Sequence, residues 1–305
     1  MPLRGAVPHP PFHRSPGSTR TRSSSAGRAE GTAPEDPRSR TRRRYRRRMG
    51  VALIVLAAGY GAAAGWLLPR AAYRFSVEPG EPWRDRCPQG HRVRGWLGPA
   101  RCRVPVQAVV QGPGGRPPEY AAPHAYGRRA VPLAALVGAL CALVGAAVGA
   151  RPEALPYVGL APVVVLLSLV DRAVHRLPDV LTLPLAVAGA AGLGAAALLP
   201  RAGGDWRLAL LGGGALGAAY LLLHLINPAG MGFGDVKLAL SLGVALGWYG
   251  WGVWSAGAFL GLVYGALYGL HVLLRSPDER NQGYAFGPFM AGGALTGVLL
   301  GGFGA

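Results

Sequence analysis

Long apolar runs follow one another through this chain from residue 50 to residue 304. Most of them are close to the roughly 20 residues that an α-helix needs to span a lipid bilayer. Half of the residues are hydrophobic and only 15% are charged, which is typical of a membrane protein. We therefore predict an all-α, polytopic membrane protein with about eight transmembrane helices, or seven as the alternative count. The predicted spans cover residues 50–68, 130–150, 154–174, 180–200, 206–226, 236–250, 252–274 and 286–304.

The first 48 residues differ from the rest of the chain, because they are rich in Arg, Ser, Pro and Gly and contain almost no large aliphatic residues. Such a segment cannot bury a core, so we predict that residues 1–48 form a disordered, arginine-rich tail. Met49 stands directly before the first apolar run, and one hypothesis is that translation begins there. The remainder divides into residues 49–129, with the first helix and a basic loop, and residues 130–305, a membrane-embedded domain.

The strong basic charge indicates contact with a lipid bilayer. A net charge of +18 is typical of arginines beside membrane spans, and no basic patch interleaved with aromatic residues indicates nucleic acid as a partner. The loop of residues 69–129 carries eleven arginines against four acidic residues, so the positive-inside rule places it in the cytoplasm. This orientation puts the arginine-rich tail on the opposite side of the membrane, a conflict that translation from Met49 would remove.

Two aspartates lie at the ends of apolar runs. Asp171 is near the end of residues 154–174, and Asp235 directly precedes residues 236–250. Two crossings separate them, so we expect both on the cytoplasmic face at a similar depth. A carboxylate in a membrane costs at least about 2.5–3.5 kcal/mol, which favours a functional role. Two carboxylates in one site share a proton, so that one activates a water while the other polarises a carbonyl. The pair thus predicts peptide hydrolysis without a covalent intermediate.

Asp235 is surrounded by glycine. The stretch reads Gly230-Met-Gly-Phe-Gly-Asp-Val-Lys-Leu238, and glycine permits the close approach of another backbone. We therefore expect Gly230, Gly232 and Gly234, with the neighbouring Lys237, to shape a substrate site.

Each of these polar residues also has a structural interpretation. Asp171 can pair with Arg172 at a helix end, and Asp235 can cap the helix that follows it. Lys237 can extend to the membrane interface. Asp179 follows a proline at the start of a predicted helix, where we expect it to act as the N-cap.

Three motifs in this order make the chain resemble the type IV prepilin peptidases, a family of Gly-x-Gly-Asp aspartic peptidases. The first is Leu169-Val-Asp171 followed by Arg176-Leu-Pro-Asp-Val-Leu-Thr-Leu-Pro184, and the second is the glycine-rich stretch around Asp235. The third is Ala285-Phe-Gly-Pro-Phe289, before the last apolar run. The resemblance covers roughly residues 130–304, which makes residues 130–305 the expected peptidase domain.

The resemblance implies an endopeptidase that removes the leader of type IV prepilins or pseudopilins. It assigns the catalytic pair to Asp171 and Asp235, and it implies a bacterial plasma membrane with the active site facing the cytoplasm. Such a substrate has a polar leader, a glycine before the scissile bond and an apolar helix after it. The resemblance leaves open which prepilin is the substrate.

The basic loop departs from the family pattern. Members that also methylate the new N-terminus, using S-adenosylmethionine, carry two Cys-x-x-Cys pairs, whereas this loop reads Cys87-Pro-Gln-Gly90 and Cys102-Arg-Val-Pro105. Cys87, Cys102 and His91 would bind zinc only with a fourth ligand, which the sequence does not identify. We therefore expect no metal and no cofactor, and we question N-methyltransferase activity.

Two other functions fit parts of the pattern. Carboxylates within a membrane also serve as proton relays, so a non-enzymatic transporter is the main alternative. The sequence shows no inverted repeat of the kind found in many transporters. A presenilin-type peptidase is a third hypothesis, but such enzymes pair the glycine motif with Tyr-Asp, whereas Val170 precedes Asp171 here.

Overall fold

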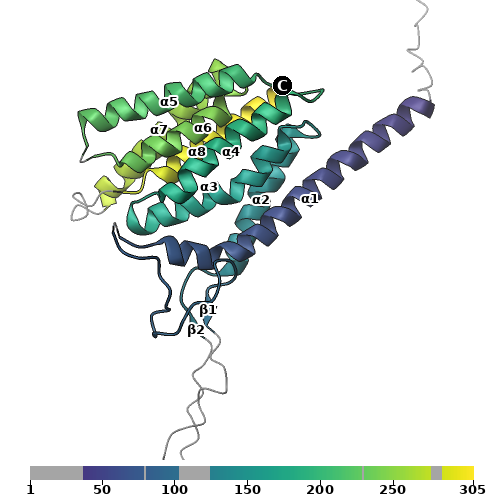
Figure 1. The fold of residues 1–305 in the computed structure, drawn as a ribbon. Helices are drawn as coiled ribbons and strands as arrows, with labels where there is room; N and C mark the ends of the chain where they lie inside the picture. The colour runs from purple at the N-terminus through teal and green to yellow at the C-terminus, as the bar shows by residue number, and fades with distance from the viewer. Residues whose placement is uncertain (1–36, 79, 103–123, 229, 276–283) are drawn as a thin grey trace, which may run out of the picture. The chain divides into compact units, whose positions relative to one another are not determined.

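A computed structural model describes the chain except for residues 1–36, 79, 103–123, 229 and 276–283 (Figure 1). Within the described residues, eight helices carry almost all of the regular structure, together with a small ladder of two short strands. The helices are α1 (Pro37–Phe75), α2 (Ala130–Val148), α3 (Ala154–Val174), α4 (Asp179–Ala197), α5 (Trp206–Ile226), α6 (Phe233–Gly247), α7 (Trp251–Arg275) and α8 (Gly287–Gly304).

Seven of the described helices are long and apolar enough to cross a membrane. The exception is α6, which has 15 residues and is therefore shorter than a normal span. The prediction of an all-α, polytopic membrane protein is thus confirmed, and the count of spans matches the lower of the two predicted numbers. Helix α1 begins at Pro37, before the predicted end of the tail at residue 48, while residues 1–36 lie outside the described residues.

Helix α6 is the central element of the helices around the candidate site. It is buried on almost every side, and its apolar residues form one core with side chains from α3, α4, α5 and α8. Burial on all sides explains why α6 is hydrophobic around its circumference rather than amphipathic. Its first turn therefore lies where the ends of several helices meet. The core residues of α6 in this cluster are Val236, Leu238, Ala239, Leu242 and Leu246.

Glycines let α6 pack closely against α5. A Cβ at Gly212 of α5 would lie 2.7 Å from the carbonyl oxygen of Gly243 in α6, and a Cβ at Gly243 would lie 2.5 Å from the carbonyl oxygen of Gly212. Neither distance can be tolerated, so the two backbones meet directly. Small residues at such contacts are typical of helix pairs in membranes, where the hydrophobic effect does not drive association.

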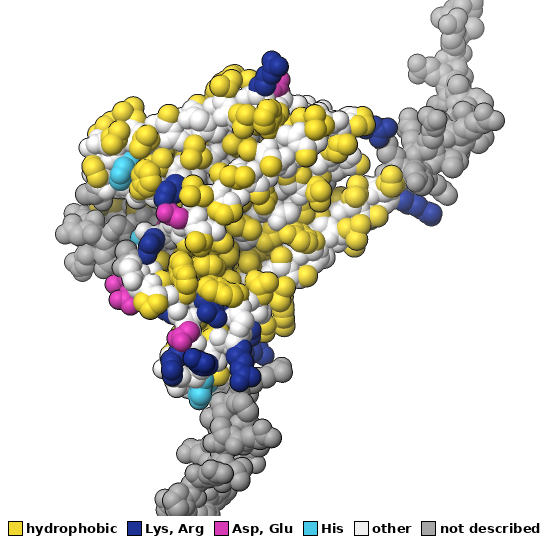
Figure 2. Space-filling view, in the orientation of Figure 1, with side chains coloured by type: hydrophobic (Ala, Val, Ile, Leu, Met, Phe, Trp, Pro, Cys, Tyr) yellow, Lys and Arg dark blue, Asp and Glu magenta, His cyan; other side chains and the backbone are white. Residues whose placement is uncertain are grey.

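The outer surface of the bundle is apolar. Large hydrophobic side chains are more than half exposed on several helices, and Figure 2 shows hydrophobic side chains over most of the visible bundle. Such a surface is expected to contact lipid, because it would be unfavourable in water. Examples are Leu155, Val187, Leu222, Phe259 and Leu300.

Residues between α1 and α2 include the two short strands, β1 (Arg101–Cys102) and β2 (His124–Ala125). The strands pair antiparallel, with Cys102 opposite His124. Arginines from the end of α1 hold this loop: Arg70 donates hydrogen bonds to the carbonyl oxygens of Arg94 and Leu97, over 2.7 and 3.0 Å. The proposed division into a tail, a first helix with a basic loop and a membrane-embedded domain stays a prediction.

Candidate functional site

Asp171 lies in the last turn of α3 and is only 4% exposed. Its Oδ2 atom accepts a hydrogen bond of 2.9 Å from the backbone N–H of Gly287, the first residue of α8. The N–H groups at a helix start have no partner within the helix, and the helix dipole is positive there. The start of α8 therefore holds the carboxylate in a fixed orientation.

Asp235 lies in the first turn of α6 and is 9% exposed. It precedes the apolar residues of α6, and α6 is not among the seven helices long enough to span a membrane. Burial is the main cause that raises the pKa of Asp235, to about 7, and the negative charge of Asp171 is the second cause. The two carboxylates are thus close enough to influence each other, as two carboxylates in one site do.

Three elements converge on this pair. A Cβ at Gly287 would lie 2.7 Å from Asp171 Oδ2 and 3.5 Å from a methyl group of Leu238, one turn after Asp235. The end of α3 and the starts of α6 and α8 therefore meet at one point. The sequence analysis predicted that both aspartates lie at one end of the bundle, and it identified the Phe-Gly-Pro stretch as the third motif of the family resemblance. It did not reveal that the Gly287 amide contacts Asp171, because that contact joins residues 116 positions apart.

The glycines before Asp235 have different surroundings. A Cβ at Gly234 would lie 2.9 Å from the Cβ of Leu177, in the segment between α3 and α4. This glycine lets the turn pack against the segment that follows Asp171. A Cβ at Gly230 would overlap the side chain of Asn227, whose Oδ1 accepts a hydrogen bond from the Gly230 N–H.

Gly232 differs from its two neighbours. A Cβ at Gly232 would lie nearest to Asp235 Oδ2, at 3.7 Å, which is an ordinary contact distance. Packing among the described residues therefore does not require glycine at this position, although the missing side chain leaves space directly beside the carboxylate. Nearby, His224 of α5 holds the turn through a 2.8 Å hydrogen bond between its Nδ1 and the carbonyl oxygen of Met231.

Lys237 and Asp179 form an ion pair beside the site. The Lys237 Nζ atom lies 2.6 Å from Asp179 Oδ1 and connects α6 with the first turn of α4. The prediction that Asp179 is an N-cap is wrong, since Pro178 holds that position and no side chain caps this helix. Asp179 instead pairs with the ammonium group of Lys237. Residue preferences at helix starts do not predict this contact, because it joins residues that are distant in the sequence.

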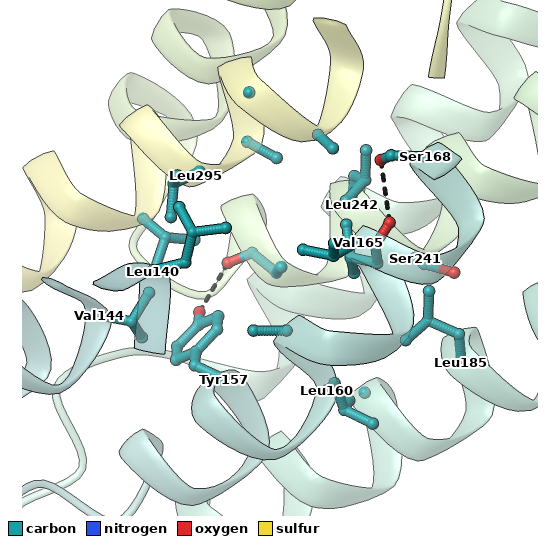
Figure 3. A pocket seen from close by; sticks show the side chains of 18 of the residues that line it. Leu140, Val144, Tyr157, Leu160, Val165, Ser168, Leu185, Ser241, Leu242 and Leu295 are labelled. Atoms are coloured by element: carbon teal, nitrogen blue, oxygen red, sulfur yellow. Dashed lines mark hydrogen bonds between the residues drawn. The ribbon is translucent and has the colours of Figure 1, made fainter. Parts of the chain in front are cut away.

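An apolar cavity of about 390 Å³ lies between α2, α3, α4, α6 and α8 (Figure 3), and neither aspartate is among its lining residues. Ser168, Leu169 and Arg172 line it next to Asp171, and Pro288 lines it next to Gly287. The rest of the lining is largely aliphatic, with Ser241 and Tyr157 as polar exceptions. The Tyr157 hydroxyl donates to the carbonyl oxygen of Ala245 over 2.7 Å. Further lining residues labelled in Figure 3 are Leu140, Val144, Leu160, Val165, Leu185 and Leu295.

A second group of polar side chains lies in the loop between α1 and α2. Cys87, His91 and Cys102 are joined there by His124, and one potential ligand atom from each residue lies within 4.8 Å of the others. The sequence identified the first three residues and no fourth. The spacing of cysteines and histidines along the sequence did not indicate His124, because this residue comes to lie beside Cys102 through the pairing of β1 with β2.

Comparison with known proteins finds relatives of this chain. The sequence model of the type IV leader peptidase family matches residues 158–274, a range that contains both aspartates. A protein of Burkholderia pseudomallei strain 1026b, named prepilin leader peptidase/N-methyltransferase, is 31% identical over 227 residues. That alignment covers 72% of this chain and 67% of the relative.

Other bacterial proteins of the same name are similar to parts of the chain. One from Pseudomonas putida is 33% identical over 178 residues, which covers 54% of this chain and 58% of the relative. One from Stutzerimonas stutzeri is 35% identical over 138 residues, which covers 44% and 46%. No solved structure matches the chain. Because these relatives are named for two activities, they do not confirm our doubt about N-methyltransferase activity.

Proposed function

Because this chain belongs to the type IV leader peptidase family, we propose that it is an aspartic endopeptidase that removes the leader peptide from type IV prepilins or pseudopilins. The catalytic residues of this proposal are Asp171 and Asp235. The observation that carries it is the meeting of two buried carboxylates from α3 and α6, with the Gly287 amide fixed on one of them. Such a pair serves acid–base hydrolysis directly, and neither residue has another ionic partner among the described residues.

The two carboxylates have different surroundings, which suggests their roles. The Gly287 N–H donates to Asp171 and fixes its orientation, whereas the pKa of Asp235, raised to about 7, keeps a large share of its carboxyl group protonated at neutral pH. Asp171 then takes a proton from a water, whose oxygen adds to the carbonyl carbon of the scissile bond. Asp235 gives its proton to the carbonyl oxygen. When this gem-diol intermediate collapses, Asp171 gives its proton to the leaving nitrogen, Asp235 takes a proton back from a hydroxyl of the diol, and the C–N bond breaks, which returns both carboxyls to their starting states.

The surroundings of the pair fit a substrate with a polar leader and an apolar helix. In this proposal the backbone around the scissile bond lies over Gly232, where the missing side chain leaves space beside Asp235. The apolar cavity of Figure 3 is lined by Leu169 and Arg172, on either side of Asp171 in the sequence, and in this proposal it receives apolar side chains that follow the scissile bond. Lys237 and Asp179 hold the start of α6 against α4 and thereby position Asp235.

We place the active site at the cytoplasmic face of a bacterial plasma membrane. Arg172 and Arg176 lie beside the end of α3, and arginines are concentrated in the loop between α1 and α2. In Figure 2, Lys and Arg side chains gather at the end of the molecule where β1 and β2 lie in Figure 1. Both observations support this orientation through the positive-inside rule.

A reconstituted reaction tests the proposal. The purified protein in detergent is incubated with a prepilin that carries a basic leader ending in glycine, and the product is identified by N-terminal sequencing. We expect one cut after that glycine. The main alternative, a proton-coupled transporter, is tested in proteoliposomes with a pH-sensitive dye. Proton flux without any cleavage of prepilins and pseudopilins would contradict the proposal.

A further inference from the structure

Four side chains in the loop between α1 and α2 form a compact set of metal-ligand groups. They are Cys87, His91, Cys102 and His124, and one ligand atom from each lies within 4.8 Å of the other three. Both cysteines are buried, and both histidines are partly buried. Two thiols and two imidazoles are the ligand set of many structural zinc sites.

The backbone presents these four residues in two pairs. Cys87 and His91 flank a tight turn, in which the Cys87 N–H donates to the His91 carbonyl oxygen over 2.9 Å and Gly90 adopts a positive φ of 83°. Cys102 and His124 face each other across the pairing of β1 with β2. A turn that contributes two ligands and a strand pair that contributes two more can enclose one ion.

The distances agree with tetrahedral coordination. His124 Nε2 lies 3.3 Å from Cys87 Sγ, and His91 Nδ1 lies 3.5 Å from the same sulfur. A tetrahedral zinc ion has bonds of about 2.3 Å to sulfur and about 2.0 Å to nitrogen, which places neighbouring ligand atoms roughly 3.3 to 3.8 Å apart. These two pairs therefore already lie at the separations of a zinc site, and the other ligand atoms lie within 4.8 Å of one another.

The described part of this loop has a very small apolar core of its own. Its buried apolar cluster consists of Cys87, Val93 and Cys102, with Tyr73 and Tyr126 packed against it. Two of the three buried residues are thus the cysteines themselves. A core this small does not fold a segment without a disulfide, a metal or external contacts. Here Arg70 and Arg74 of α1 provide external contacts, and a metal would connect the turn with the strands.

We propose that Cys87, His91, Cys102 and His124 bind one Zn²⁺ ion, with His91 and His124 as ligands in place of the cysteines that the two motifs lack. Two thiolates balance the charge of the ion, so the site is neutral overall. The ion cross-links the turn at Cys87 to the strand pair β1–β2 and fixes the loop beside the end of α1. The earlier expectation of no metal rested on a missing fourth ligand, which His124 supplies.

The test uses the full chain, purified in detergent under reducing conditions, and does not depend on peptidase activity. Metal analysis should find about one zinc per chain. Replacement with Co²⁺ should give the intense visible bands of a tetrahedral site and near-ultraviolet bands from thiolate ligands. The variants His91→Ala and His124→Ala should each lower zinc occupancy at least about tenfold. The matched control is His271→Ala, since His271 is exposed on α7, outside the cluster.

Cysteine replacements separate loss of a ligand from loss of folding. His91→Cys and His124→Cys should retain zinc, and their Co²⁺ forms should gain intensity in the thiolate bands. The proposal is overturned if the wild-type chain takes up neither Zn²⁺ nor Co²⁺. It is equally overturned if His91→Ala and His124→Ala bind both ions as the wild type does. A Cys87–Cys102 disulfide that persists under reducing conditions, detected by mass spectrometry, would also overturn it.

Discussion

The backbone N–H of Gly287, at the start of α8, donates a 2.9 Å hydrogen bond to the carboxylate of Asp171 at the end of α3. This bond connects the last helix of the chain to the first of the two candidate catalytic residues. It also gives the glycine of the Phe-Gly-Pro stretch a physical role. Any side chain at residue 287 would enter the space of the Asp171 carboxylate, since a Cβ there would lie only 2.7 Å from Oδ2.

We predict that Gly287→Ala lowers prepilin cleavage by at least about tenfold while the protein still folds. The new methyl group displaces a flexible carboxylate rather than a backbone, so the misplacement affects chemistry more than packing. Cleavage rate and the thermal unfolding midpoint in detergent are measured together. Gly252→Ala is the matched control, because a Cβ there meets nothing within 4 Å. Normal cleavage by Gly287→Ala would remove the positioning role of this contact.

We predict different effects for alanine substitutions at two glycines near Asp235. Gly232→Ala should leave the unfolding midpoint almost unchanged, because its Cβ finds only ordinary contact distances. It should nevertheless slow cleavage, since the methyl group fills the space proposed for the substrate backbone. Gly234→Ala should lower the unfolding midpoint, because its Cβ would lie 2.9 Å from Leu177 Cβ. If Gly232→Ala cleaves at the wild-type rate, the substrate backbone does not lie over residue 232.

The ion pair between Lys237 and Asp179 is expected to contribute little to stability. Asp179 is 61% exposed, so solvent screens the attraction, and such pairs are worth about 0–1 kcal/mol. We predict that Lys237→Ala and Asp179→Asn each reduce cleavage less than about tenfold. In a double-mutant cycle, the second substitution should add almost nothing to the first. Fully additive effects on kcat/KM would show that the two residues act separately.

The pH dependence of kcat/KM should be bell-shaped. Burial, and next the charge of Asp171, raise the pKa of Asp235 to about 7. The working pair holds one proton, so the rate falls as pH rises above the higher apparent pKa and that proton is lost. The rate also falls in acid, where the second carboxylate becomes protonated and the base is lost. A rate that stays constant from pH 6 to pH 9, with the enzyme stable throughout, would contradict a shared proton.

The sequence predicts the helices well because apolar length alone determines which segments can span a bilayer. It also predicts that Asp171 and Asp235 lie at the same end of the bundle, since counting crossings requires no knowledge of packing. The contacts within the site are different. The bond from Gly287 to Asp171, the pair of Lys237 with Asp179, and the position of His124 beside Cys102 all join residues that are distant along the chain. Local patterns carry no signal for such contacts.

Helix α6 is a second case in which the local sequence pattern does not determine the surroundings of a segment. Its apolar run resembled a membrane span, yet the helix covers only Phe233–Gly247 and is enclosed by its neighbours. A helix surrounded by protein needs hydrophobic residues on every side, as a helix in lipid does. Hydrophobicity therefore cannot distinguish the two environments, although helix length can.

The most direct test of the account is the cleavage of a co-expressed prepilin by Asp171→Asn and Asp235→Asn, followed by a mobility shift of the substrate. Each variant keeps the shape of the side chain and removes its ability to exchange a proton. Asp205→Asn is the matched control, because Asp205 caps α5 through its side chain and asparagine caps a helix equally well. We predict that both site variants lose cleavage by on the order of 100-fold or more, while the control cleaves normally. Normal processing by either site variant, at wild-type protein levels, would contradict the shared catalytic pair.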